Sequence, residues 1–232
     1  MRDVAMSTSN FRFKQFTIWH DKCAMKVGTD GVLLGAWSPL GSRILDIGTG
    51  SGLIARMLMQ RCPEAKVEGI DIDEASVGQA NENGVHAYHA RLQEWEGGPY
   101  DLIVSNPPFF QNSLKNPDQG RQTARHTDTL SYEDLISHSA RLLAENGRLA
   151  LILPAEAEQE IVSLAANHGL TLTHITRVFS KETKPAKRTL MAFVKLKIKN
   201  LKFKIIEDTL VLEDEKGGRS AAYSELCKEF YL

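Results

Sequence analysis

Short apolar runs alternate with helix-like segments through the middle of the chain. The apolar runs predict strands at 43–47, 66–70, 85–89, 100–105, 148–153, 172–179 and 189–198, and the segments between them predict helices at 53–61, 74–82, 131–144 and 156–168. This alternation is typical of a doubly wound sheet whose strands are mainly parallel. The last two strands are joined by a short charged loop. The pattern therefore predicts an α/β fold with a seven-stranded, mainly parallel sheet that ends in an antiparallel hairpin.

The two ends of the chain depart from this alternation. Residues 1–40 form an N-terminal extension, in which 11–20 are expected to be an extended or hairpin segment and 32–37 to form a short helix. Residues 200–232 form an appendage, with a small hairpin of 202–206 and 210–213 and a helix over 220–230. A long polar loop is expected at 110–130. At 232 residues and 42% hydrophobic, the chain 1–232 suits one α/β domain with these additions.

Composition and charge limit the cellular compartment and the kinds of partner that the sequence suggests. The three cysteines are widely spaced, which indicates neither a disulfide framework nor a zinc site and favours a reducing cytoplasm. No apolar run is long enough to span a bilayer. The net charge is −1, but nine basic residues and a single acidic one lie between 181 and 204. Such a patch is typical of a surface that binds a phosphate backbone, although a solvated basic face is the alternative. Oligomeric state is not encoded in any visible pattern.

A glycine-rich turn follows the first predicted strand. Gly48, Gly50 and Gly52 have the spacing G-x-G-x-G, and Asp46 lies two residues before the first of them. A strand, such a turn and a helix form a place where backbone closely approaches a ligand. The dinucleotide fingerprint is G-x-G-x-x-G, so the observed spacing disfavours a nicotinamide oxidoreductase. A carboxylate at Asp46 suits the amino group, or an ordered water, of a cationic cofactor without phosphate.

The second predicted strand supplies the next candidate residues. Asp71 ends this strand about 20 residues after the glycines, where a carboxylate can bind both hydroxyls of a ribose. Ile72 follows it and is placed to flank an adenine ring.

The strand at 100–105 runs into Asn106-Pro107-Pro108-Phe109. The prolines impose a rigid, carbonyl-rich turn at the carboxyl end of the strand, where open α/β sheets bind ligands. The Asn106 amide oxygen and the Pro107 carbonyl are two acceptors that can hold an NH2 group, and Phe109 offers a face for base stacking. The tetrapeptide predicts methylation of an amino group conjugated to a ring or carbonyl. A purely structural Pro-Pro turn is the alternative.

Together these motifs resemble the class I S-adenosylmethionine-dependent methyltransferases, with D-x-G-x-G-x-G as the cofactor loop and N-P-P-F as the clamp for the target amine. Residues 13–16, 21–37, 125–128 and 230–232 are also similar to the bacterial tRNA1(Val) (adenine-37-N6)-methyltransferase family. This resemblance implies a Rossmann-like methyltransferase sheet and S-adenosyl-L-methionine as the cofactor. It also implies N6-methylation of the adenine just 3′ of a valine tRNA anticodon, with the anticodon stem-loop region as partner and no metal.

The resemblance also suggests roles for residues outside the motifs. Thr29 and Asp30 precede a short helix and are expected to reach the methionine end of the cofactor, with helix capping as the alternative. Gln93 is expected near the cofactor's adenine, and Asn106 is expected to contact the cofactor as well as the target amine. The predicted RNA contacts are Lys14, Arg125, His126, Lys195 and Lys197.

Other functions remain open from the residues alone. An N-P-P-aromatic clamp also serves methyltransferases that act on ribosomal RNA guanine, DNA adenine or a protein glutamine amide. A non-catalytic RNA-binding module with the same fold is a further class. The presence of Asp46, Asp71 and Asn106 together argues against it.

Overall fold

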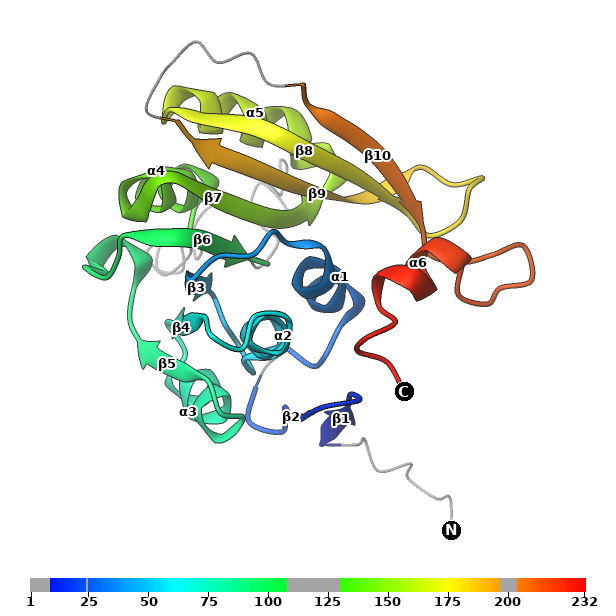
Figure 1. Cartoon of the computed structure of the whole chain (residues 1–232), viewed down its shortest axis with the longest axis horizontal. Helices are drawn as coiled ribbons and strands as arrows, with labels where there is room; N and C mark the ends of the chain where they lie inside the picture. The colour runs from blue at the N-terminus through cyan, green and yellow to red at the C-terminus, as the bar shows by residue number, and fades with distance from the viewer. Residues whose placement is uncertain (1–8, 24, 108–129, 197–203) are drawn as a thin grey trace, which may run out of the picture.

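The computed structural model describes residues 9–23, 25–107, 130–196 and 204–232. An eight-stranded sheet forms their centre, in the order β10-β8-β9-β7-β6-β3-β4-β5 (Figure 1). Strand β9 is antiparallel to both of its neighbours, and the other neighbouring pairs in the sheet are parallel. The strands are β3 (Arg43–Ile47), β4 (Lys66–Asp71), β5 (His86–His89), β6 (Tyr100–Ser105), β7 (Leu143–Pro154), β8 (Leu170–Phe179), β9 (Ala186–Lys195) and β10 (Ile206–Val211).

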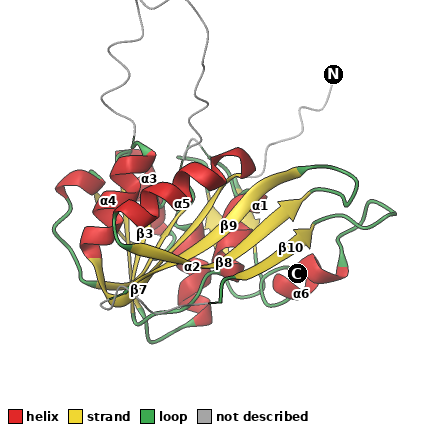
Figure 2. Cartoon of the chain, turned by 90° about the horizontal axis from the view of Figure 1, so that it is seen from above, coloured by secondary structure: helices red, strands yellow, loops and turns green. Residues whose placement is uncertain are grey.

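Helices lie on both faces of this sheet (Figure 2). They are α1 (Thr29–Trp37), α2 (Leu53–Arg61), α3 (Glu74–Glu82), α4 (Tyr132–Leu142), α5 (Glu158–Asn167) and α6 (Ala221–Leu226), with short 3-10 turns at η1 (Leu92–Glu94) and η2 (Ala155–Ala157). Successive strand residues face opposite sides, so Ile44 packs in one core with α1, α2 and α3 while Leu45 packs in the other with α4 and α5. No helix within the described residues is both long and apolar enough to cross a bilayer.

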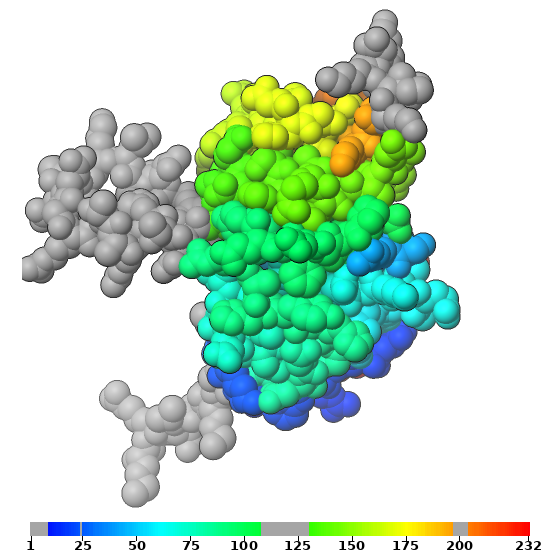
Figure 3. Space-filling model, turned by 90° about the vertical axis from the view of Figure 1, so that its left-hand side faces the viewer, coloured from blue at the N-terminus to red at the C-terminus, as the bar shows by residue number. Residues whose placement is uncertain are grey.

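The N-terminal extension folds back onto the end of the chain. Strands β1 (Asn10–Arg12) and β2 (Thr17–Trp19) form the expected hairpin. The Phe13 ring stacks on that of Tyr231 with centroids 6.1 Å apart, and the Lys14 N–H donates to the Phe230 carbonyl at 2.9 Å. Figure 3 shows the blue N-terminal residues at the rim of the cyan and green part of the molecule.

The C-terminal segment differs from the sequence prediction. The hairpin expected from 202–206 and 210–213 is wrong, because residues 206–211 form one strand that pairs in parallel with β8. The polar residues that suggested a turn belong to an edge strand, and their side chains bind those of β8. Asp208 accepts a hydrogen bond from His174, and Glu207 accepts one from Arg177. Leu210 is buried against the core. The sheet therefore has one strand more than predicted, and the helix expected over 220–230 is limited to Ala221–Leu226.

The placement of β10 predicts a specific loss of stability. Leu210→Ala should lower the free energy of unfolding by about 2–3 kcal/mol, because it empties a buried position. Thr209→Ala, at the exposed neighbouring position, should change it by no more than about 0.5 kcal/mol. Urea unfolding of both variants measures the difference. Equal, small effects would contradict the placement of this strand.

Candidate active site

The site is built where three neighbouring parallel strands end. Ile47 of β3 pairs with Ile70 of β4 on one side and with Ser105 of β6 on the other. The Ser105 hydroxyl also donates to the Ile47 carbonyl at 2.9 Å. Because all three strands point the same way, the turns at 48–52, 71–73 and 106–107 begin side by side. The sequence motifs that follow these strands therefore meet at one edge of the sheet.

The glycine-rich turn is attached to β4 by three hydrogen bonds from its backbone N–H groups. The N–H groups of Gly48 and Thr49 donate to the Ile70 carbonyl, and the Gly50 N–H donates to Asp71 Oδ2 at 2.9 Å. Gly48 and Gly50 have φ angles of 68° and 54°, a region that favours glycine. A Cβ at either position would meet no atom within 4 Å. The turn thus presents bare backbone to open space, as a cradle for a ligand does.

Asp46 lies beneath this turn and is fully buried. Its Oδ2 accepts from the Thr49 hydroxyl at 2.8 Å and from the Ala55 N–H at 3.3 Å. Its Oδ1 has no partner among the described residues. Burial raises the pKa of this carboxyl to about 7, with a smaller contribution from the negative charge of Asp71. The group is therefore poised to ionise when a cation approaches.

A cavity of about 330 Å³ opens in front of the turn. This is within the range of small-molecule sites, roughly 300–1,000 Å³. Five of the residues predicted to bind the cofactor line it: Thr29, Asp30, Gly48, Gly50 and Asn106. The Oδ1 of Asn106 is buried and has no partner in the described part of the chain. Buried polar atoms are normally hydrogen-bonded, so this unpaired acceptor indicates a missing donor.

The remaining predicted cofactor residues, like Asp46, are not among the residues that line the cavity. Gly52 is the N-cap residue of α2, and a Cβ there would approach Val85 to 2.8 Å. Asp71 holds the turn, since its two oxygens accept from Gly50 and Asp73. Ile72 is exposed at the end of β4. Gln93 lies in η1 and donates to Asp134 at 3.4 Å; it does not line the cavity.

The two predicted RNA contacts within the described residues, Lys14 and Lys195, are not brought together. Lys14 donates to the Lys228 carbonyl near the end of the chain. Lys195 donates to the Leu143 carbonyl at 2.8 Å, at the end of β9 opposite the site. Other predicted residues lie outside the described part of the chain, namely Pro108, Phe109, Arg125, His126 and Lys197.

The basic run between 181 and 204 is divided by β9. Arg188, near the start of that strand, donates from Nε to Asp30 Oδ2 at 2.7 Å, which places the β8–β9 loop beside the cavity. Lys195 ends the strand, and at about 3.3 Å per residue the two edges are roughly 25–30 Å apart. Lys184 and Lys187 therefore lie on the side of the sheet where β3, β4 and β6 end, which we call the site edge. Lys195 lies on the opposite side, where these strands begin.

Sequence reasoning missed part of the cavity wall. Met25, Lys26 and Gly28 line the cavity together with Ser51. No spacing rule identifies such residues, because they come from the extension that precedes α1. Within the described residues, no cluster of three or more His, Cys, Asp or Glu side chains is arranged to hold a metal ion.

Comparison with known proteins identifies the family. The model of the methyltransferase small domain family matches residues 27–168. A tRNA1(Val) (adenine(37)-N6)-methyltransferase from Bacteroides fragilis is 46% identical, over 98% of this chain and 99% of the relative. The enzyme of the same name from Aeromonas hydrophila is 41% identical, over 97% and 98%.

Solved structures show that the fold is shared more widely. A predicted O-methyltransferase from Agrobacterium tumefaciens has a TM-score of 0.65 at 17% identity, over 87% of this chain and 96% of the other. A putative class I S-adenosylmethionine-dependent methyltransferase from Listeria monocytogenes has a TM-score of 0.55 at 16% identity, over 81% and 65%. From the matches in sequence, the chain belongs to the methyltransferase small domain family and, within it, to the tRNA1(Val) (adenine(37)-N6)-methyltransferases.

Proposed function

We propose that the protein transfers a methyl group from S-adenosyl-L-methionine to N6 of adenine 37 in tRNA1(Val). Relatives of that name match nearly the whole chain. The observation that most directly supports methylation of an amino group is the buried amide oxygen of Asn106 at the wall of the cavity, which has no partner among the described residues. An exocyclic NH2 group is the donor that such an acceptor lacks.

The residues around the cavity fit this cofactor. The bare backbone of Gly48 and Gly50 allows a ligand to lie directly on the turn. Asp71 accepts one backbone N–H on each oxygen and retains lone pairs for the hydroxyls of a ribose. The exposed Ile72 would cover one face of the adenine. The unpaired oxygen of Asp46 would receive the amino group directly or through water.

The target amine needs orientation more than deprotonation. The N6 lone pair of adenine is delocalised into the ring, so the amine is a poor nucleophile. Asn106 Oδ1 and the Pro107 carbonyl would accept its two N–H groups and favour a more tetrahedral nitrogen. The cofactor supplies a methyl group on a sulfonium that departs as a neutral thioether. The amine proton becomes acidic only as the N–C bond forms, so no strong base is required, and positioning supplies much of the rate.

The tRNA would approach the site edge of the sheet. Lys184 is exposed in the β8–β9 loop and Lys187 is exposed near the start of β9, and neither has an ion-pair partner among the described residues. Lys181 is paired with Glu213 at 3.4 Å. We assign the phosphate contacts closest to the cavity to Lys184 and Lys187. Phe109 would stack on the flipped adenine, as such bases are commonly held. The three cysteines are free, in keeping with a cytoplasmic enzyme.

The direct test is methyl transfer from labelled S-adenosyl-L-methionine into unmodified bulk tRNA, followed by nucleoside analysis. The proposal expects the label in N6-methyladenosine. Parallel assays offer ribosomal RNA, DNA and protein as substrates. Label in ribosomal RNA guanine, in DNA adenine or in a protein amide, with none in tRNA, would show that the clamp binds another substrate.

Asn106→Ala should lower turnover at least ~100-fold, which is typical for loss of a positioned catalytic contact. The affinity for S-adenosylhomocysteine should change far less, because the turn at 48–52 is untouched. Single-turnover assays and calorimetric titration measure the two quantities. Turnover close to wild type would contradict the clamp.

Cofactor affinity should rise with pH and level off above about pH 7. The Asp46 carboxyl is protonated in the free protein below about 7, and a cationic ligand favours its ionised form. Asp46→Asn should flatten this profile between about pH 5.5 and about pH 7.5. The pH dependence of folding stability has the opposite sign to that of cofactor affinity. The carboxyl of the unfolded chain ionises near 3.8, so the unliganded wild-type protein should become less stable as pH rises from about 4 to about 7. A pH-independent affinity in wild type would contradict the role given to Asp46.

Replacing Lys184 and Lys187 together by Gln should raise KM for tRNA and reduce the salt dependence of tRNA binding, since each lysine releases counterions on contact with phosphate. Cofactor affinity should be unchanged. Lys195→Gln, at the far edge, is the comparison. If Lys195→Gln changed KM for tRNA and the salt dependence more than the double variant of Lys184 and Lys187, the result would favour the prediction made from the sequence. It would contradict the assignment of the phosphate contacts to Lys184 and Lys187.

A further inference from the structure

The C-cap residue of α3, Asn83, connects two parts of the chain that are far apart in sequence. Asn83 is buried, and its amide makes three hydrogen bonds. Oδ1 accepts from the Trp19 N–H at 3.0 Å, and Nδ2 donates to the Trp19 carbonyl at 2.8 Å. The same Nδ2 donates to the Ser51 carbonyl at 2.8 Å. One side chain thus binds both backbone groups of the last residue of β2 and a carbonyl of the glycine-rich turn.

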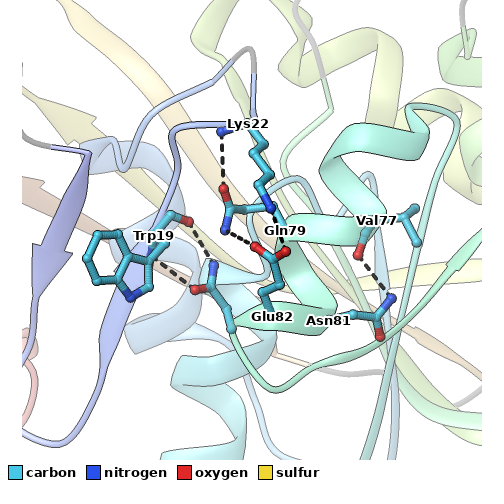
Figure 4. A network of polar contacts seen from close by, with 7 residues as sticks. Trp19, Lys22, Val77, Gln79, Asn81 and Glu82 are labelled. Carbon is cyan, nitrogen blue, oxygen red and sulfur yellow. Dashed lines mark hydrogen bonds and ion pairs between the residues drawn. The ribbon is translucent and has the colours of Figure 1, made fainter.

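A second contact from the same helix continues this attachment. Gln79 accepts from the Lys22 N–H at 3.1 Å, and Glu82 forms an ion pair with the Lys22 ammonium. Figure 4 shows Lys22 beside Gln79 and Glu82 of α3. Gln79 is almost completely buried, so its bond is shielded from water. The segment that leaves β2 is therefore fixed to α3 at two successive points.

This segment continues directly into the cavity wall. Met25, Lys26 and Gly28 lie a few residues beyond Lys22 and line the cavity opposite the glycine-rich turn. The wall and the turn are not neighbours in sequence. Asn83 is the side chain that contacts both the start of the wall segment and the turn, through Trp19 and Ser51.

We propose that Asn83 is a positioning residue for the cofactor: it sets the N-terminal wall of the cavity against the glycine-rich turn. The inference rests on the proposed function, because it takes the cavity to be the cofactor site. Without this amide, the carbonyls of Ser51 and Trp19 lose their shared donor. The wall then moves away from the turn, and the cofactor must order it again on binding. The N-terminal extension is on this account a part of the cofactor site.

Asn81 provides a matched control on the same helix. Its Nδ2 donates to the carbonyls of Val77 and Ala87, each at 3.0 Å, and its Oδ1 accepts from the Ala87 N–H at 3.1 Å. This amide also makes three hydrogen bonds, but its partners lie within α3 and β5. None of these three hydrogen bonds goes to the hairpin or to the turn. Its loss should reduce stability without reaching the cofactor site.

The experiment compares Asn83→Ala, Asn83→Asp and Asn81→Ala in the full chain. Calorimetric titration with S-adenosylhomocysteine gives the affinity, and thermal unfolding without ligand gives Tm. The Asn83 variants should bind roughly tenfold more weakly, the size expected for losing one buried hydrogen-bond partner. Asn81→Ala should bind as wild type does, although its Tm falls. Trypsin should cleave after Lys22 or Lys26 faster in the Asn83 variants than in Asn81→Ala.

The outcomes separate the inference from the proposed function. Weaker binding confined to the Asn83 variants, with KM for the cofactor raised and kcat at saturation largely kept, supports a positioning role. Equal affinity in wild type and the Asn83 variants overturns it, as does equal weakening by Asn81→Ala. If Asn83→Asp does not fold, Asn83→Ala decides the question. Wild-type protein that fails to bind S-adenosylhomocysteine would overturn the proposed function itself.

Discussion

The parallel pairing of β4, β3 and β6 is the constraint on which the site depends. Parallel neighbours must end at the same edge of a sheet, and the register Ile47 to Ile70 and Ile47 to Ser105 leaves little room for slippage. A shift by one residue would turn each buried side chain of β3 to the opposite face. The glycine-rich turn, Asp71 and Asn106 meet because of this register, although Asp71 follows the turn by about 20 residues and Asn106 follows Asp71 by 35.

Two polar atoms at this edge are left without partners, and both are costly to bury. Asp46 Oδ1 and Asn106 Oδ1 have no hydrogen bond among the described residues. An unpaired buried acceptor typically destabilises a fold by about 1–3 kcal/mol. A fold selected for stability alone would pair or replace them. Their position beneath and beside the cavity is consistent with a site that gains these bonds on binding a cationic cofactor and an amine.

Much of the sheet could be predicted from local sequence. The strands at 43–47 and 100–105 have the predicted bounds, since each is a short apolar run that stops at turn-forming residues. Strand β10 was missed because an edge strand can carry polar side chains on its exposed positions. The sequence Glu207-Asp208-Thr209 looks like a turn until β8 is known to lie beside it. Which strand lies beside β10 depends on the tertiary fold, and no local sequence pattern contains that information.

The same limit applies to the site. The glycines, Asp46 and Asn106 are recognisable because their chemistry follows from their place after a strand. Asn83 is not, since its partners Trp19 and Ser51 lie 64 and 32 residues away. The arrangement of the basic run is hidden from the sequence for a related reason. Sequence adjacency suggested one patch, whereas β9 carries its two ends to opposite edges of the sheet.

The most direct measurement compares methyl transfer to two transcripts of tRNA1(Val) that differ only at position 37, one with adenine and one with guanine. If Asn106 and Pro107 hold the N6 amine of adenine 37, labelled methyl groups should enter the first transcript as N6-methyladenosine and should not enter the second. Equal incorporation into both transcripts would contradict the account, because the acceptor would then be a different nucleotide.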